Sequence, residues 1–203
     1  MNENCAKQTD STAASKAIVD MCRLAAEGNV EAARKLAEMV FNRIHKTASY
    51  LASNLSDAED LAQAACVEVL CSAGSFRGES SLHYWADRVT IQTAAKLLTT
   101  TTRRRKIWDR YHQPERTVTG SDKLTDRAAA RHRLAALLST LKLPQREMLL
   151  LCYVHGYTTQ EAADVCGIPF ETARGRLKKG RSKLKRKVVK DPLLSEWIRD
   201  WSI

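Results

Sequence analysis

Residues 157–184 read YTTQEAADVCGIPFETARGRLKKGRSKL, and this stretch decides how the second half of the chain folds. Thr158 and Glu161 have the spacing of a capping box, which fixes the start of a short helix. Gly167 stands where that helix would end in a left-handed residue, and Pro169 stands where a second helix would begin. Two helices joined by so short a turn predict a helix-turn-helix.

The second helix of this motif has a large excess of positive charge. Residues 171–190 contain ten Lys or Arg and one Glu. Ala173 and Leu177 are expected to face the core of the domain. The opposite side of the helix has the short polar and basic side chains that a helix needs to read the major groove. A solvated basic helix is the alternative, but its self-repulsion favours a polyanionic partner. The residues predicted to contact DNA are Thr172, Arg174, Gly175, Arg176, Lys178, Lys179 and Arg181.

The formal net charge of the 203 residues is +10, and all of the surplus lies in the second half. Residues 1–100 contain 10 Lys or Arg and 12 Asp or Glu, whereas residues 101–203 contain 23 and 11. The chain has only 8 Gly and 4 Pro, too few for the many turns of a β protein. We therefore expect an all-α protein whose C-terminal half binds a polyanion and whose first half binds another partner.

Apolar periodicity and its interruptions predict two small helical domains joined by a flexible linker. The linker contains Pro114 and Gly120 and has no periodicity. The last thirteen residues have an apolar face at helical spacing, which predicts a helix that docks on its own domain, packs between the two domains or receives a partner. The predicted segments are a disordered lead-in (1–14), a helical domain (15–108), the linker (109–126), the helix-turn-helix domain (127–190) and an amphipathic extension (191–203).

Other classes of protein find no support in the sequence. The six cysteines form no CxxC pair and no zinc-like cluster, so we expect reduced thiols and no metal. No glycine-rich phosphate loop or carboxylate pair indicates an enzyme, and no cofactor is expected. We find no signal peptide and no membrane span, which predicts a cytoplasmic protein without membrane insertion.

The first domain has two further motifs. Ser56 and Glu59 have capping-box spacing at the start of an acidic helix. Residues 75–81 (SFRGESS) predict a loop, and the helix that follows them contains Trp85. An amphipathic surface helix and a core tryptophan are the ordinary interpretations of these two features.

With both domains in view, the chain resembles the extracytoplasmic-function (ECF) group of bacterial RNA polymerase sigma factors. Residues 143–184 are similar to the domain that reads the −35 promoter element. Asp57–Gln63 (DAEDLAQ) looks like the helix that grips the polymerase β′ subunit, and residues 76–85 look like the module that melts the −10 element. Ala86 and Gln92 depart from the family pattern, which usually has Leu and Asn there.

The resemblance implies a sigma factor that binds core RNA polymerase, through β′ and β, and directs promoter recognition and melting. The resemblance leaves open whether an anti-sigma factor is a further partner. A stand-alone helix-turn-helix regulator is the alternative function, although it leaves residues 57–85 unexplained. The implied polymerase-binding residues are Asp57, Asp60, Leu61 and Gln63. The implied −10 residues are Phe76, Glu79, Ser80, Ser81, Trp85, Arg88, Gln92, Arg103, Arg104 and Arg105.

Overall fold

The structure is a computed structural model that describes residues 3–111 and 126–191, with side chains for 15–99 and 133–191. These residues form eight α-helices and one short 3-10 helix, with no strand among them, so the all-α prediction is confirmed. The helices are α1 (Glu3–Ala26), α2 (Val30–Leu51), α3 (Leu55–Cys71), η1 (Ala73–Ser75), α4 (Leu82–Tyr111), α5 (Asp126–Ser139), α6 (Leu143–Tyr153), α7 (Thr159–Cys166) and α8 (Phe170–Val188).

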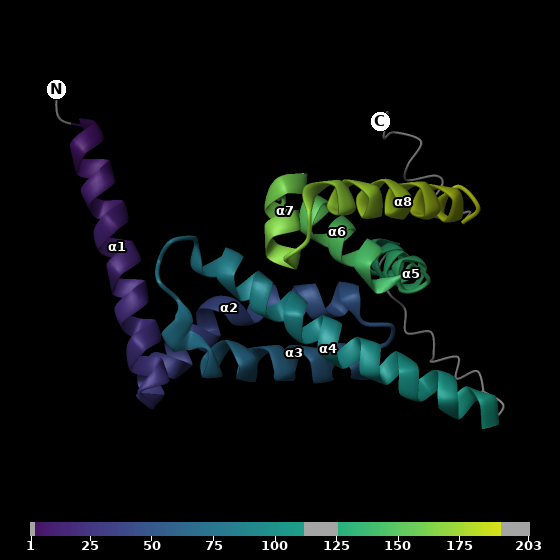
Figure 1. Cartoon of the computed structure of the whole chain (residues 1–203), viewed down its shortest axis with the longest axis horizontal. Helices are drawn as coiled ribbons and strands as arrows, with labels where there is room; N and C mark the ends of the chain where they lie inside the picture. Colours follow the sequence, from purple (N-terminus) through teal and green to yellow (C-terminus); the bar gives the residue numbers. More distant parts are fainter. Residues whose placement is uncertain (1–2, 112–125, 192–203) are drawn as a thin grey trace.

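The N-terminal domain comprises α1 to α4 (Figure 1). Helices α2, α3 and α4 pack against one another, and α1 packs across one end of them. Leu36, Val40 and Ile44 of α2 are spaced by about one turn and are almost fully buried, as are Leu61 and Val69 of α3. This spacing gives each helix one apolar side, which faces the shared core.

Three helix boundaries differ from the sequence prediction. Residues 3–14 continue α1 where a disordered lead-in was expected, since no Gly or Pro interrupts this stretch. Helix α3 begins two residues earlier than predicted, because Asn54 Oδ1 accepts a hydrogen bond from the Asp57 amide at 2.8 Å. The capping box expected at Ser56 is therefore wrong. Helix α4 continues to Tyr111, so the first residues of the expected linker are helical. The rest of the linker, up to residue 125, lies outside the described residues.

The C-terminal domain comprises α5 to α8, and its local signals are confirmed. Both hydrogen bonds of the Thr158–Glu161 capping box are present at the start of α7. Gly167 ends α7 in the left-handed region with φ of 63°, and Pro169 is the N-cap of α8. Residues 158–188 therefore form the predicted helix-turn-helix.

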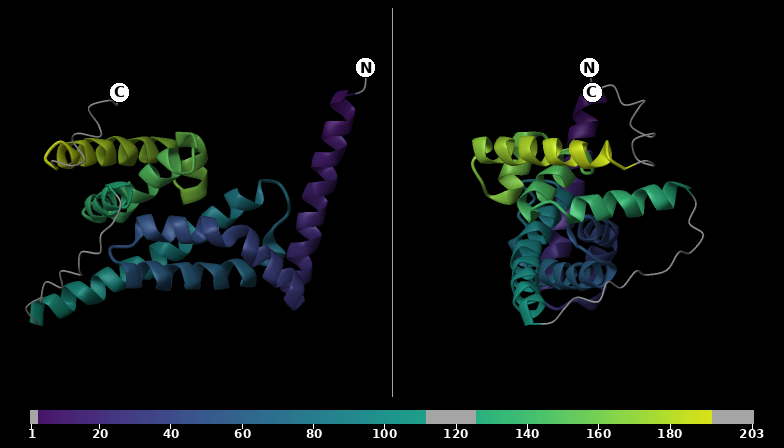
Figure 2. Two further views of the ribbon diagram at one scale, coloured as in Figure 1. Left: turned by 180° about the vertical axis from the view of Figure 1, so that it is seen from behind. Right: turned by 90° about the vertical axis from the view of Figure 1, so that its right-hand side faces the viewer.

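The two domains dock against each other (Figure 2). Helix α4 packs against α7, and α2 packs against α5 and α6. Their buried residues form one continuous apolar cluster that includes Leu61 and Met148. Among the described residues, no helix is long and apolar enough to cross a membrane. The predicted extension after residue 191 lies outside the described residues.

Candidate nucleic-acid interface

Helix α8 presents a basic surface to solvent. Its inner side is fixed by Ala173, which is fully buried, and by Gly180, where an added Cβ would lie 3.3 Å from Gln145 O of α6. Arg174 pairs with Glu171 at 2.7 Å, but both side chains are about two-thirds exposed, so the pair is weak and easily exchanged for a phosphate. The predicted DNA-contacting residues with exposed side chains are Thr172, Arg174, Lys178, Lys179 and Arg181.

Two predicted residues of α8 are less accessible. Gly175 and Arg176 are only partly exposed. Arg176 lies close to Glu147 of α6, and Glu147 is only 5% exposed. Burial raises the pKa of Glu147 to about 7, although Arg176 and Arg146 act in the opposite direction. Arg176 thus joins the surface of α8 to the interior of the domain.

Residues 76–81, which are predicted to melt the −10 element and are called the melting loop after that prediction, connect η1 to α4. Phe76 is 6% exposed, and its ring centroid lies 5.5 Å from that of the half-buried Trp85. Phe76 therefore belongs to the core and presents no free face to a DNA base. Glu79, Ser80 and Ser81 have exposed side chains.

Three further groups of α4 were predicted to contact DNA. Arg88 and Gln92 are both exposed and stand one helical turn apart, so they share one side of α4. The run of arginines is also within α4. The side chains of these arginines lie outside the described part of the structure; the residues are Arg103, Arg104 and Arg105.

The predicted polymerase-binding helix, α3, offers only part of the expected set. Asp60 and Gln63 are exposed, whereas Leu61 is fully buried and so cannot contact another protein. Asp57 is half-buried and accepts a hydrogen bond from Asn54 Nδ2 at 2.9 Å. Val67 of the same helix is 54% exposed, so the prediction from apolar periodicity that it packs inward is wrong.

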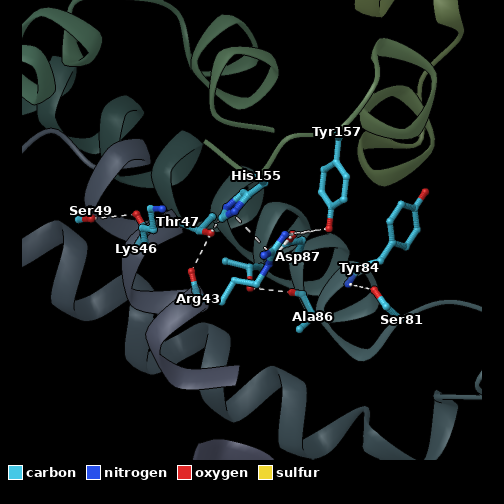
Figure 3. Close-up of polar contacts among 11 residues, drawn as sticks. Arg43, Lys46, Thr47, Ser49, Ser81, Tyr84, Ala86, Asp87, His155 and Tyr157 are labelled. Atoms are coloured by element: carbon cyan, nitrogen blue, oxygen red, sulfur yellow. Dashed lines mark hydrogen bonds and ion pairs between the residues drawn. The ribbon is translucent and has the colours of Figure 1, made fainter. Parts of the chain in front are cut away.

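A polar network joins the two domains next to the melting loop (Figure 3). Arg43 of α2 donates from Nε and Nη2 to the Asp87 carboxylate of α4, at 2.7–3.0 Å. The Asp87 side chain is 2% exposed. Tyr157, which precedes α7, donates its hydroxyl to Asp87 Oδ2 at 2.7 Å and accepts from Arg43 Nη2 at 3.0 Å. Sequence reasoning missed these residues, because they are far apart along the chain.

His155 belongs to the same network. Its Nε2 lies 2.8 Å from Thr47 Oγ1 and 4.0 Å from Asp87 Oδ1. The Thr47 hydroxyl donates its hydrogen bond to the Arg43 carbonyl, so Thr47 Oγ1 accepts a hydrogen bond from His155 Nε2. Burial lowers the pKa of His155 to about 4; the Asp87 carboxylate raises it, and Arg43 and Lys46 lower it further. His155 is therefore neutral at neutral pH.

Other interdomain bonds use backbone carbonyls. The Arg146 guanidinium of α6 donates to Leu51 O at the end of α2, and to Ala52 O at 3.3 Å. Tyr84 of α4 donates its hydroxyl to Glu161 O at 3.4 Å, and its ring meets that of Tyr157 edge-on. The C-terminal domain thus satisfies carbonyls that the end of α2 leaves unpaired.

The part of the chain that the structure describes contains no metal site, and two of its cysteines are held as thiols by burial. No group of three or more His, Cys, Asp or Glu side chains there could hold a metal ion. Burial raises the pKa of the Cys22 thiol to about 11 and that of Cys166 to about 12, so both stay protonated and unreactive at neutral pH.

An exposed basic helix-turn-helix beside a second helical domain defines a DNA-binding protein. The family model of Sigma-70 region 2 matches residues 36–104, and the model of Sigma-70, region 4 matches residues 131–184. The chain belongs to the ECF group of sigma-70 family RNA polymerase sigma factors. This is a class of transcription initiation proteins and not a class of enzymes.

Several relatives share most of the chain. The ECF RNA polymerase sigma factor EcfG of Rhodopseudomonas palustris is 30% identical over 134 residues, which are 66% of this chain and 72% of that protein. The ECF RNA polymerase sigma factor SigC of Mycobacterium tuberculosis is 27% identical over 173 residues, which are 83% of this chain and 90% of that protein.

Solved structures share the fold. CnrH, in complex with the cytosolic domain of CnrY, is 20% identical, with a TM-score of 0.60 over 86% of this chain and 99% of that chain. The sigma factor RpoE of Bartonella quintana, in complex with the anti-sigma factor NepR, is 22% identical, with a TM-score of 0.55 over 75% of this chain and 94% of that chain. The match to Sigma-70 region 2 accounts for the N-terminal domain, which the alternative function of a stand-alone regulator left unexplained. The sigma factor is therefore the better supported of the two functions.

Proposed function

We propose that this sigma factor reads the −35 element with α8 and opens the −10 element with the melting loop. The observation that carries this proposal is the outer side of α8, where short polar and basic side chains are exposed over a fully buried Ala173. Thr172 and Arg174 lie in the first turns of α8, the part of a recognition helix that reaches base edges. Lys178, Lys179 and Arg181 follow and contact phosphates.

The melting loop captures bases that leave the duplex. Unstacking a base costs a few kcal/mol, so the protein must offer it stacking and hydrogen-bonding groups. Glu79 and Ser80 supply polar atoms, and the half-buried Trp85 stands behind them at the start of α4. Arg88 and Gln92 extend the same surface along α4.

Core RNA polymerase binds through α3, and its β′ subunit is the partner we propose there. Asp60 and Gln63 provide the polar contacts, and the exposed Val67 adds apolar area. The β subunit is proposed to hold the C-terminal domain. The protein itself performs no covalent chemistry, requires no cofactor and acts in the cytoplasm, where polymerase and promoter DNA are found.

An anti-sigma factor is a further proposed partner. RpoE of Bartonella quintana, which shares the fold, was solved with the anti-sigma factor NepR.

In vitro transcription with core polymerase over a promoter library tests the proposed function. We expect transcripts from promoters that share two short elements near −35 and −10. Arg174→Ala should weaken −35 binding by about 1–3 kcal/mol. Lys190→Ala is the matched control, because it removes the same charge from an exposed residue beyond the end of α8. Absence of transcription from every promoter, or equal losses in both variants, would contradict the proposal.

A further inference from the structure

The melting loop packs directly against helix α1. Gly78 has a φ of +74°, which L side chains rarely adopt. A Cβ at this position would lie 2.8 Å from Val19 Cγ2 and 3.3 Å from Ser15 Oγ, both on α1. Position 78 therefore needs glycine for its backbone conformation and also for its contact with α1.

A second contact lies just before the loop. A Cβ at Gly74 of η1 would be 3.2 Å from the Ala26 Cβ, near the end of α1. Ser15 and Val19 are one helical turn apart and Ala26 is two turns further, so all three share one side of α1. Figures 1 and 2 both show α1 running beside the segment that joins η1 to α4.

The other end of the loop is anchored by α4. Ser81 Oγ accepts a hydrogen bond from the Tyr84 amide at 3.1 Å, and Ser81 O accepts one from the Trp85 amide at 3.1 Å. The Ser81 hydroxyl is thus engaged as the cap of α4. Between the two anchors, at Gly78 and Ser81, stand only Glu79 and Ser80, whose side chains are exposed.

We infer that α1 is a positioning element for base capture, with Val19 and Ser15 setting where Glu79 and Ser80 stand. The inference rests on the proposed function of the melting loop. A loop held at both ends loses less freedom when a base binds, because that freedom is already lost on folding. Releasing one loop residue should lower −10 opening about tenfold, which corresponds to the backbone freedom of about one residue.

The test uses holoenzyme assembled from core polymerase and full-length variants. Permanganate reactivity of −10 thymines reports opening, and duplex −35 binding reports the C-terminal domain. Val19→Ala should lower opening about tenfold and leave −35 binding unchanged. Leu24→Ala, at a 40% exposed position of α1, is the control and should change neither. Ser15→Ala, at a half-buried position, replaces Val19→Ala if the latter lowers the melting temperature.

A pair of variants distinguishes positioning from general support. Gly78→Ala places a methyl group against Val19 and should lower opening more than Val19→Ala does. Adding Val19→Ala to Gly78→Ala should restore part of the opening, because the double variant has room for the methyl group. The same change is then harmful alone and beneficial in combination. Relief of the clash also restores folding stability, so opening is measured at a temperature where the melting temperatures show every variant fully folded, and rescue under that condition is the result that positioning requires.

The outcomes separate this inference from the function on which it rests. If Glu79→Ala and Ser80→Ala lower opening but Val19→Ala and Ser15→Ala behave like Leu24→Ala, the loop captures bases without α1 and the inference is overturned. If neither Glu79→Ala nor Ser80→Ala changes opening, the proposed function of the loop fails, and the inference fails with it.

Discussion

Replacing Tyr157 with Phe would remove one hydroxyl from between the two domains. That hydroxyl donates to Asp87 Oδ2 at 2.7 Å and accepts from Arg43 Nη2 at 3.0 Å. Burial and the Asp87 carboxylate both raise the pKa of Tyr157, so it keeps the proton that it donates. Phe preserves the ring, which meets Tyr84 edge-on at 5.5 Å. The bonds between Arg43 and Asp87 lie within the N-terminal domain and survive.

The loss of docking free energy depends on the two charged groups to which the hydroxyl is hydrogen-bonded. A hydrogen bond to a charged group contributes about 1.5–3 kcal/mol, and the two bonds share one hydroxyl and one ion pair, so they do not add fully. We expect Tyr157→Phe to weaken docking by about 2–3 kcal/mol, which is roughly a 30- to 150-fold change in the docking equilibrium.

His155 makes this change measurable as a function of pH. Thr47 and Asp87, which enclose its ring, belong to the other domain, so the lowered pKa of about 4 depends on docking. A group whose pKa is lowered by docking favours the docked state above its ordinary pKa, and this contribution is lost as pH falls from about 6.5 towards 4. The full effect is about 3 kcal/mol. Acid should therefore separate the domains.

Small-angle scattering of the free protein between pH 7 and pH 4 measures this separation as a rise in the radius of gyration. Tyr157→Phe should expand at a higher pH than the wild type, because less docking energy opposes protonation of His155. Tyr153→Phe is the matched control, since Tyr153 is 59% exposed and lies on the surface of α6. Identical profiles for the wild type and Tyr157→Phe, or an equal shift in Tyr153→Phe, would refute the role given to this hydroxyl.

Three other outcomes are expected. The raised pKa of Glu147, about 7, removes stability as pH rises from 4.5 through 7, while His155 contributes in the opposite direction. Glu147→Gln should therefore gain stability relative to the wild type over that range in urea unfolding, and a difference between the two proteins that does not change with pH would contradict this assignment. DNA binding by the full chain should weaken steeply with salt, with a logarithmic slope of about −4 if the four exposed cations of the predicted contact set (Arg174, Lys178, Lys179 and Arg181) neutralise phosphates, and a flat titration would count against them. Arg146→Ala should destabilise docking by about 1.5–3 kcal/mol, because it leaves the carbonyls of Leu51 and Ala52 unpaired. The same scattering titration measures this effect. A wild-type profile would contradict the role given to Arg146.

The helix-turn-helix could be predicted from the sequence because its signals are local. The Thr158–Glu161 box and the left-handed Gly167 each depend on residues within one or two helical turns. The start of α3 was harder to predict, since Asn54 and Ser56 are both good caps two residues apart. The Asn54 side chain makes the bond to the Asp57 amide, and the helix begins there.

Assigning single residues to sites from the sequence was less successful at Leu61 and Phe76. Each stands inside a motif with a functional resemblance, yet Leu61 is fully buried and Phe76 is 6% exposed. A motif gives residue types and their order, but which side of a helix or loop faces the core depends on the neighbouring helices. Asp60, Gln63, Glu79 and Ser80 remain exposed beside them.

The sequence by itself determined the all-α class, the helix-turn-helix and the basic side of α8. Helical periodicity and capping depend on residues that are close together along the chain. Only the tertiary structure decided that α1 borders the melting loop and that the two domains dock. Asp87 is 44 residues from Arg43 and 70 from Tyr157, and no periodic pattern links positions so far apart. Their bonds exist because packing of α2, α4, α6 and α7 brings them together in a buried place, where each charge requires a partner.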